Sequence, residues 1–141
     1  MPDKNTGEAK RLDGGPIACR LRLNPSAESS YLGDVEIENV SPELIEIMTQ
    51  ASKWEHLNFI TWDDNGTIVS KYHYGSGFSP HFQNVVWKWL PGEILTMRCV
   101  SLMATVPDNE CKPGKYRVQA VYAYETLHAA SDVIEFEYIP T

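Results

Sequence analysis

The sequence is short of basic residues and of long apolar runs, and each shortage excludes a class of protein. Twelve Lys and Arg stand against 19 Asp and Glu, so the formal net charge is −7. Phosphate groups attract clustered Lys and Arg, so this balance excludes nucleic acid and anionic membrane surfaces as expected partners. No apolar stretch approaches the roughly 20 residues that span a bilayer, and residues 1–5 contain no apolar signal core. Taken as written, the sequence predicts a cytoplasmic protein.

Cysteines are also few, and their spacing matches no metal-binding or redox motif. Cys19, Cys99 and Cys111 form no CxxC pair, and none lies near a histidine at metal-ligand spacing. Cys19 and Cys99 lie in strand-like patterns, where we expect small buried side chains. A disulfide between Cys99 and Cys111 is conceivable, but a reducing compartment disfavours it. The sequence therefore predicts neither a disulfide framework nor a catalytic cysteine.

The pattern that the sequence does have is alternation of period two, clearest from Gly114 to Tyr124. Large and small residues alternate there without a break, which predicts a half-buried β-strand. Tyr116 stands at the start of this segment, two residues before the small apolar Val118. That position predicts a tyrosine corner, in which the ring enters the core and the hydroxyl bonds a backbone group a few residues upstream.

Other segments show the same alternation between turn residues. We expect strands at residues 17–23, 31–39, 57–62, 67–74, 94–103 and 132–139. In the second of these, Val35 and Ile37 are expected to point inward and Asp34 outward. Asn65-Gly66 supplies the positive φ angles of a tight hairpin. Residues 43–51 fit both a helix and a strand, and their β-branched side chains favour the strand.

These elements predict an all-β fold in one domain. Residues 1–16 have no periodicity and are expected to form a flexible arm, while residues 17–141 are one domain by length. Residues 125–131 are expected to be a turn. Seven to nine short strands with regular turns, and no βαβ spacing, predict an antiparallel immunoglobulin-like β-sandwich.

Several turn motifs resemble those of known sandwich domains. Pro91-Gly92-Glu93 and the run from Pro113 to Tyr116 look like the close of immunoglobulin-like and fibronectin-III-like domains of bacterial proteins. With Asn39-Val40-Ser41 and the turn from Asp63 to Gly66, their order is similar to the intracellular proteinase inhibitor family of bacilli. The resemblance covers residues 17–139 and implies a protein-binding domain, in its sharpest form a proteinase inhibitor. Turn chemistry specifies architecture better than function.

The best candidate binding surface is the aromatic segment from Gly75 to Leu90. Its candidate contact residues are Phe78, His81, Phe82, Trp87 and Trp89. Aromatic side chains dominate the hot spots of protein interfaces. On a strand, Trp87 and Trp89 share one face, with Val86, Lys88 and Leu90 on the other; the two tryptophans then belong either to the core or to the interface.

A second candidate surface is the tip of the loop from Thr105 to Pro113. Its residues are Asp108, Asn109 and Glu110. We expect both candidate segments to act from the rim of the sandwich, because a sandwich leaves mainly its end loops free to contact a partner.

No metal, cofactor or catalytic group is predicted. The four histidines, at positions 56, 73, 81 and 128, lack the spacing that brings two imidazoles together locally. Asp63-Asp64-Asn65 lacks the further oxygens of a calcium loop, and Ser76 and Ser79 stand outside any Gly-x-Ser-x-Gly motif. The sequence thus predicts a non-catalytic module that binds another protein. The alternatives are an accessory domain of a larger complex, or a hydrolase built on His81.

Overall fold

The computed structural model describes residues 15–24, 30–49, 53–73, 85–103, 106–107 and 111–139. These residues form ten strands: β1 (Ile17–Leu23), β2 (Leu32–Asn39), β3 (Ile45–Thr49), β4 (Leu57–Asp63), β5 (Ile68–His73), β6 (Val85–Trp89), β7 (Ile94–Ser101), β8 (Gly114–Tyr124), β9 (Leu127–Ala130) and β10 (Ile134–Tyr138). Every strand pair is antiparallel. The predicted all-β fold is confirmed, and within the described ranges no helix could cross a membrane.

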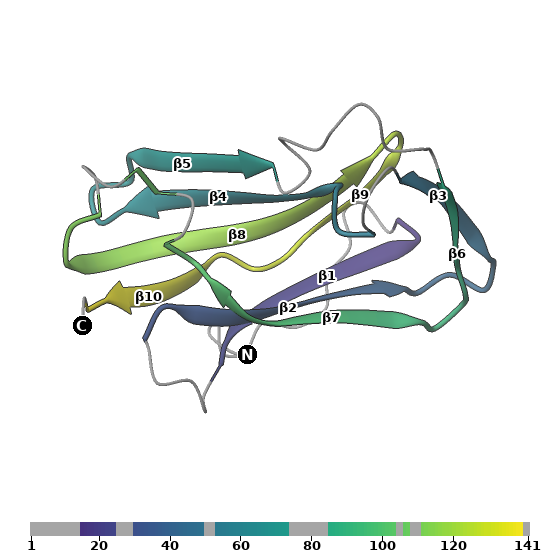
Figure 1. Ribbon diagram of the computed structural model, residues 1–141, viewed down its shortest axis with the longest axis horizontal. Helices are drawn as coiled ribbons and strands as arrows, with labels where there is room; N and C mark the ends of the chain where they lie inside the picture. The colour runs from purple at the N-terminus through teal and green to yellow at the C-terminus, as the bar shows by residue number, and fades with distance from the viewer. Residues whose placement is uncertain are drawn as a thin grey trace.

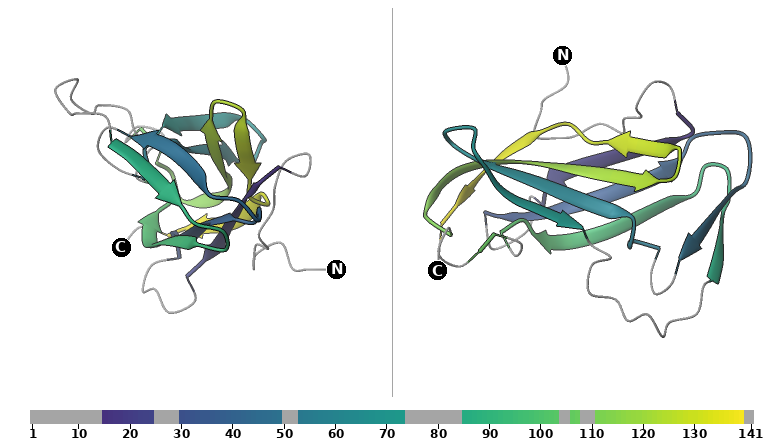
Figure 2. Two further views of the ribbon diagram at one scale, coloured as in Figure 1. Left: turned by 90° about the vertical axis from the view of Figure 1, so that its right-hand side faces the viewer. Right: turned by 90° about the horizontal axis from the view of Figure 1, so that it is seen from above.

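The strands form two main sheets and one small sheet. The main sheets have the orders β1-β2-β7 and β10-β8-β4-β5, with β9 also paired to β8. The long strands run along the longest axis of the molecule, and β3 and β6 pair with each other across one end (Figure 1). The end-on view places this two-stranded sheet in front of the ends of the long strands (Figure 2). We refer to it as the end sheet.

Alternating side chains from both main sheets build the core, as the period-two pattern predicts. The buried members include Ile17, Cys19, Leu21, Val35, Ile37, Leu57, Phe59, Val118, Ala120, Tyr122, Ile134 and Phe136. Burial of this kind is the main stabilising contribution in a sandwich. The ambiguous segment 43–51 contains β3 and is a strand, as its β-branched residues indicate.

The predicted tyrosine corner is present at the start of β8. Tyr116 is buried, and its hydroxyl donates a hydrogen bond to the Lys112 carbonyl at 2.6 Å. The same hydroxyl accepts a hydrogen bond from the Lys112 N–H at 3.2 Å. One side chain therefore fixes how the chain enters its longest strand.

The predicted hairpin between β4 and β5 is also present, but of Asn65 and Gly66 only Gly66 has a positive φ. Gly66 has a φ of 81°, which a residue without Cβ adopts readily. The Asp63 carboxylate accepts hydrogen bonds from the N–H groups of Asn65 and Thr67, both at 2.9 Å. The Asp63 carboxylate thus has a structural role in closing the turn.

Three expectations about local structure are wrong. Cys99 is exposed, because a bulge sets Asp34 of β2 against two residues of β7 and shifts the β7 side chains that follow. Asp34 is buried, although Val35 and Ile37 beside it still point inward as expected. The Asp34 carboxylate accepts the N–H of Cys99, whose φ is 56°, at 3.0 Å. Residues 125–131 contain β9 as well as a turn; Glu125 makes that turn with a φ of 51°, without the Gly or Asn that usually marks one.

The predicted N-terminal arm falls mostly on residues 1–14, which lie outside the described residues. Its last residue, Pro16, is part of the fold, because its carbonyl accepts a hydrogen bond from the Val40 N–H at 2.9 Å. Cys19, Cys99 and Cys111 form no disulfide with one another.

Candidate protein-binding surface

The end sheet has one face turned into the core. In the register of β3 and β6, Ile45 lies opposite Trp89 and Ile47 lies opposite Trp87. Trp87 and Trp89 are only 7% and 0% exposed, and their rings stack at a centroid distance of 4.8 Å. Of the two alternatives left by the sequence, both tryptophans therefore occupy the core, and their rings are not available to a partner on the surface.

Buried Asn39 joins the end sheet to the end of β2. Its side-chain amide donates to the carbonyls of Trp89 at 2.9 Å and Glu43 at 2.8 Å. Its side-chain oxygen accepts from the N–H and the hydroxyl of Ser41 at 3.0 and 2.7 Å. Ser41 therefore completes a turn, and both N–H groups of the Asn39 side-chain amide are hydrogen-bonded inside the fold.

A second set of contacts joins β3 to the end of β8. The Met48 N–H donates to the Tyr124 hydroxyl at 3.2 Å, and the Met48 carbonyl lies 2.9 Å from the His56 ring nitrogen Nε2, which acts as the donor. The rings of His56 and Tyr124 pack at 4.6 Å. Trp89 meets the buried ring of Tyr122 edge-on at 5.9 Å. Aromatic packing thus holds the core side of the end sheet, and side chains of His56 and Tyr124 hold its backbone by hydrogen bonds.

Two polar atoms under the end sheet are buried without a hydrogen-bond partner among the described residues: Nε1 of Trp87 and the hydroxyl of Tyr122. Burial raises the pKa of Tyr122 well above its ordinary value, with smaller contributions from the charges of Glu55 and Tyr124. On the rim, the Lys53 ammonium lies 5.0 Å from the centre of the Trp87 ring, within cation–π distance.

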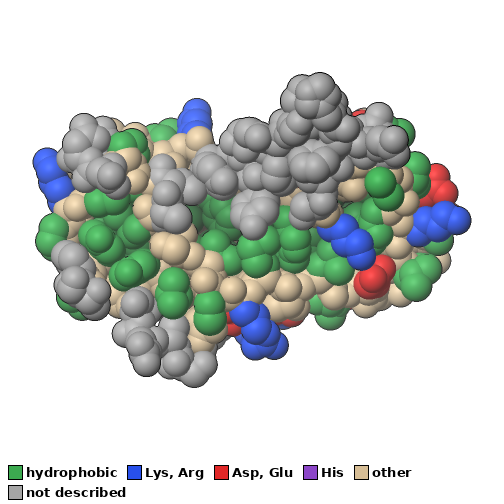
Figure 3. Space-filling view, in the orientation of Figure 1, with side chains coloured by type: hydrophobic (Ala, Val, Ile, Leu, Met, Phe, Trp, Pro, Cys, Tyr) green, Lys and Arg blue, Asp and Glu red, His purple; other side chains and the backbone are tan. Residues whose placement is uncertain are grey.

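The opposite face of the end sheet is exposed and largely apolar. We call it the outer face and define it as Leu44, Glu46, Met48, Val86, Lys88 and Leu90. Five of the nine large hydrophobic side chains that are exposed among the described residues lie in β3 or β6, or directly beside them. Figure 3 shows hydrophobic, acidic and basic side chains together at this end of the molecule. Exposed apolar groups gathered on one small sheet indicate an interaction surface.

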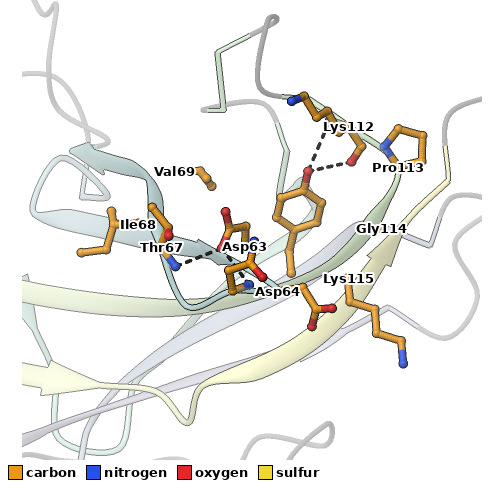
Figure 4. A pocket seen from close by; sticks show the side chains of 11 residues that line it. Asp63, Asp64, Thr67, Ile68, Val69, Lys112, Pro113, Gly114 and Lys115 are labelled. Atoms are coloured by element: carbon orange, nitrogen blue, oxygen red, sulfur yellow. Dashed lines mark hydrogen bonds between the residues drawn. The ribbon is translucent and has the colours of Figure 1, made fainter.

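The other end of the sandwich carries a hollow of about 470 Å³ between two turns. Figure 4 shows the turn of Asp63 and Asp64 on one side and Lys112 and Pro113 on the other. Its best-placed polar groups already have partners within the fold, since Asp63 closes the hairpin and the Tyr116 hydroxyl closes the corner. The hollow therefore results from the geometry of the two turns, and these two polar groups are already hydrogen-bonded within the protein.

The described parts of the two predicted segments lie toward opposite ends of the molecule. The end sheet contacts the end of β8 at Tyr124, whereas the loop after β7 leads into β8 at Gly114. An 11-residue strand at about 3.3 Å per residue separates these points by roughly 35 Å.

Six of the predicted contact residues lie outside the described residues: Phe78, His81, Phe82, Asp108, Asn109 and Glu110. The described imidazoles, those of His56 and His128, each bond a backbone carbonyl. Among the described residues there is no group of three or more His, Cys, Asp or Glu placed to hold a metal ion.

Sequence reasoning noticed Val86, Lys88 and Leu90 as one face of a strand, but it missed Leu44, Glu46 and Met48 beside them. Residues 44–48 and 85–90 both fit strands, but each carries apolar side chains on both faces, so the sequence alone does not say which face is exposed. What was missing was their pairing.

No protein-family model and no curated protein matches this chain. Its function must therefore be inferred from the geometry of its surfaces.

Proposed function

We propose that this chain is a non-catalytic protein-binding module of the immunoglobulin-like class, and that the outer face of the end sheet is its contact surface. The observation that carries the proposal is an exposed apolar face on a firmly anchored sheet. Leu90 is 55% exposed, Val86 48% and Met48 45%. Binding through groups that are already held in place loses less conformational entropy than binding through free loops.

The order of the strands supports the immunoglobulin-like class. Without the end sheet and the four-residue β9, which pairs only with β8, seven strands remain: β1, β2, β4, β5, β7, β8 and β10. Strands β1, β2 and β7 form one sheet, and β10, β8, β4 and β5 form the other. Counted among these seven, they are the first, second and fifth, and the seventh, sixth, third and fourth. In immunoglobulin lettering these are A-B-E and G-F-C-C′, and the tyrosine corner then stands on strand F, where that fold carries it.

A proteinase-inhibitor role is the narrower form of this proposal, and it rests on the resemblance of the turn motifs alone. Its test is direct: endogenous proteases assayed with the protein in excess should lose activity. Full activity across the panel would remove the inhibitor role and leave the binding module in place.

An accessory domain of a larger complex is the second candidate, and the same outer face favours it. The two roles differ in the lifetime of the contact. An accessory domain would co-purify with its complex at fixed stoichiometry, whereas a regulatory binder would exchange on dilution.

The experiment is capture from a lysate of the organism of origin, with a matched pair of variants. Leu90 and Ile139 are both 55% exposed, but only Leu90 belongs to the outer face. We expect Leu90→Gln to weaken capture strongly and Ile139→Gln to leave it unchanged. Equal capture by the two variants would move the binding surface away from the end sheet.

A further inference from the structure

The outer face has an ordered arrangement of charge and apolar surface. In the register of the end sheet, Met48 lies opposite Val86, and Glu46 lies opposite Lys88. Leu44 and Leu90 stand one residue beyond the last registered pair, that of Ile45 with Trp89. The face therefore consists of three rows: an apolar row, a row with one acid and one base, and a second apolar row.

This arrangement is complementary to itself under one symmetry operation. Consider a two-fold axis that lies between two copies and runs parallel to the strands. It places β3 of one copy over β6 of the other, and each residue keeps its position along the strand direction. Glu46 then faces Lys88 of the second copy, and each apolar row faces its own kind. An axis perpendicular to the strands would instead place Glu46 against Glu46. A two-fold interface uses the same patch on both subunits, so only the first arrangement satisfies all three rows.

We infer that the outer face binds a second copy of this chain, forming a two-fold symmetric dimer in which the two end sheets stack face to face. This inference rests on the proposed function and names its partner. The apolar rows supply the affinity, and the two Glu46–Lys88 contacts between copies fix the orientation. Packed sheets lie about 10 Å apart, a gap that these side chains can fill from both sides.

The dimer is weak and depends on concentration. The outer face comprises six residues, four on two short strands and two directly beside them, fewer than the roughly 20 residues per side of a standard stable interface. Each copy also carries a net charge of −7, which opposes association at low ionic strength. The anchoring of the end sheet by Asn39 and Tyr124 favours association, because the face is held in place before the copies meet.

Charge reversal tests this geometry by sedimentation velocity across the micromolar to millimolar range. Wild type should associate as its concentration rises. Glu46→Lys makes all four central charges of the dimer positive, and Lys88→Glu makes them all negative. Each variant alone should lose association by more than about tenfold, because like charges across an interface are strongly unfavourable.

Mixing the two variants separates contacts between copies from contacts within one copy. In a mixed dimer the Glu46→Lys chain presents two positive charges to two negative charges of the Lys88→Glu chain, so association should return. The controls are Glu137→Lys and Lys115→Glu, which alter an equivalent cross-strand pair between β10 and β8. They change the net charge equally and should associate like wild type. Far-ultraviolet circular dichroism of every variant verifies the fold.

Three results would overturn the dimer. They are a wild type that stays monomeric throughout, single variants that associate like wild type, and a mixture that stays monomeric. A monomeric wild type whose lysate capture still depends on Leu90 would remove the second copy as the partner and retain the proposed function. Capture that is independent of Leu90 would remove the proposed function as well.

Discussion

The side-chain amide of Asn39 donates a hydrogen bond to the backbone carbonyl of Trp89 at 2.9 Å, across 50 positions of sequence. Backbone bonds extend this link, because the Asn39 N–H donates to the Glu93 carbonyl and the Gly92 N–H donates to the Asn39 carbonyl. A fully buried Asn therefore joins the end of β2, the end of β6 and the turn before β7. The end sheet keeps its position through this residue, and so does the outer face.

Replacement of Asn39 by Ala should destabilise the fold and loosen the end sheet. The change removes four side-chain hydrogen bonds and leaves the buried Trp89 carbonyl without its donor. We expect the free energy of unfolding in urea to fall by about 3 kcal/mol. The control is Asn65→Ala, in an exposed turn, which should change it by less than about 0.5 kcal/mol. Equal effects would show that Asn39 anchors nothing.

Removal of the hydroxyl group by Tyr→Phe should have different effects on stability at two tyrosines of β8. The Tyr116 hydroxyl makes two hydrogen bonds to Lys112, whereas the Tyr122 hydroxyl is buried with no partner among the described residues. Tyr116→Phe should lower the free energy of unfolding by about 2 kcal/mol, because the corner loses its closing bonds. Tyr122→Phe should leave it unchanged or raise it by up to about 1 kcal/mol, because it removes a desolvated group.

The comparison is made by urea unfolding of both variants at neutral pH. A destabilisation of Tyr122→Phe as large as that of Tyr116→Phe would mean that the Tyr122 hydroxyl has a partner in the folded protein.

The Asp34 carboxylate should be essential to the bulge. Its oxygen Oδ1 accepts from the Cys99 N–H and from the Asn24 side-chain amide, both at 3.0 Å. Asp34→Ala removes the acceptor of both donors, so we expect the free energy of unfolding to fall by about 2 kcal/mol. The control is Glu38→Ala on the same strand, expected to change it by less than about 0.5 kcal/mol. The rate of hydrogen exchange at the Cys99 amide should rise only in Asp34→Ala. An unchanged rate in that variant would contradict the hydrogen bond from the Cys99 N–H to the Asp34 carboxylate.

The bulge also marks where prediction from sequence fails. Counting alternate residues assumes an unbroken ladder, and one inserted residue reverses the faces of all that follow. That is why Cys99 was expected inside. Asp34 is buried for another reason, since its carboxylate bonds the Cys99 N–H at the bulge. Elements defined by local chemistry were predictable, namely the corner at Tyr116, the Asn65-Gly66 hairpin and the alternation of β8.

The candidate surface was predictable only in part, for a different reason. Aromatic content drew attention to Trp87 and Trp89, but β6 has apolar residues on both faces, and composition does not say which face meets the core. The pairing with β3 decides that, and it joins residues such as Thr49 and Val85 that lie 36 positions apart. Non-local pairing of this kind leaves no local signal.

Cys19 differs from the other two thiols in its surroundings. It is fully buried in β1, and its thiol donates to the Ala120 carbonyl at 3.8 Å. Burial raises the pKa of the Cys19 thiol from its ordinary value of 9.0 to about 12, against a smaller lowering by the backbone of Ser131. Cys99, in contrast, is exposed.

This raised pKa predicts a loss of stability in alkali. The folded pKa of Cys19 lies above the unfolded one, so its contribution is complete below pH 9 and is lost as pH rises from 9 toward 12. In that window the free energy of unfolding should fall by up to about 1.4 kcal/mol per pH unit more in wild type than in Cys19→Ala. Cys99→Ala, the control, should keep the wild-type slope. Urea unfolding at a series of pH values measures all three proteins, and a Cys19→Ala slope equal to that of wild type would contradict the raised pKa.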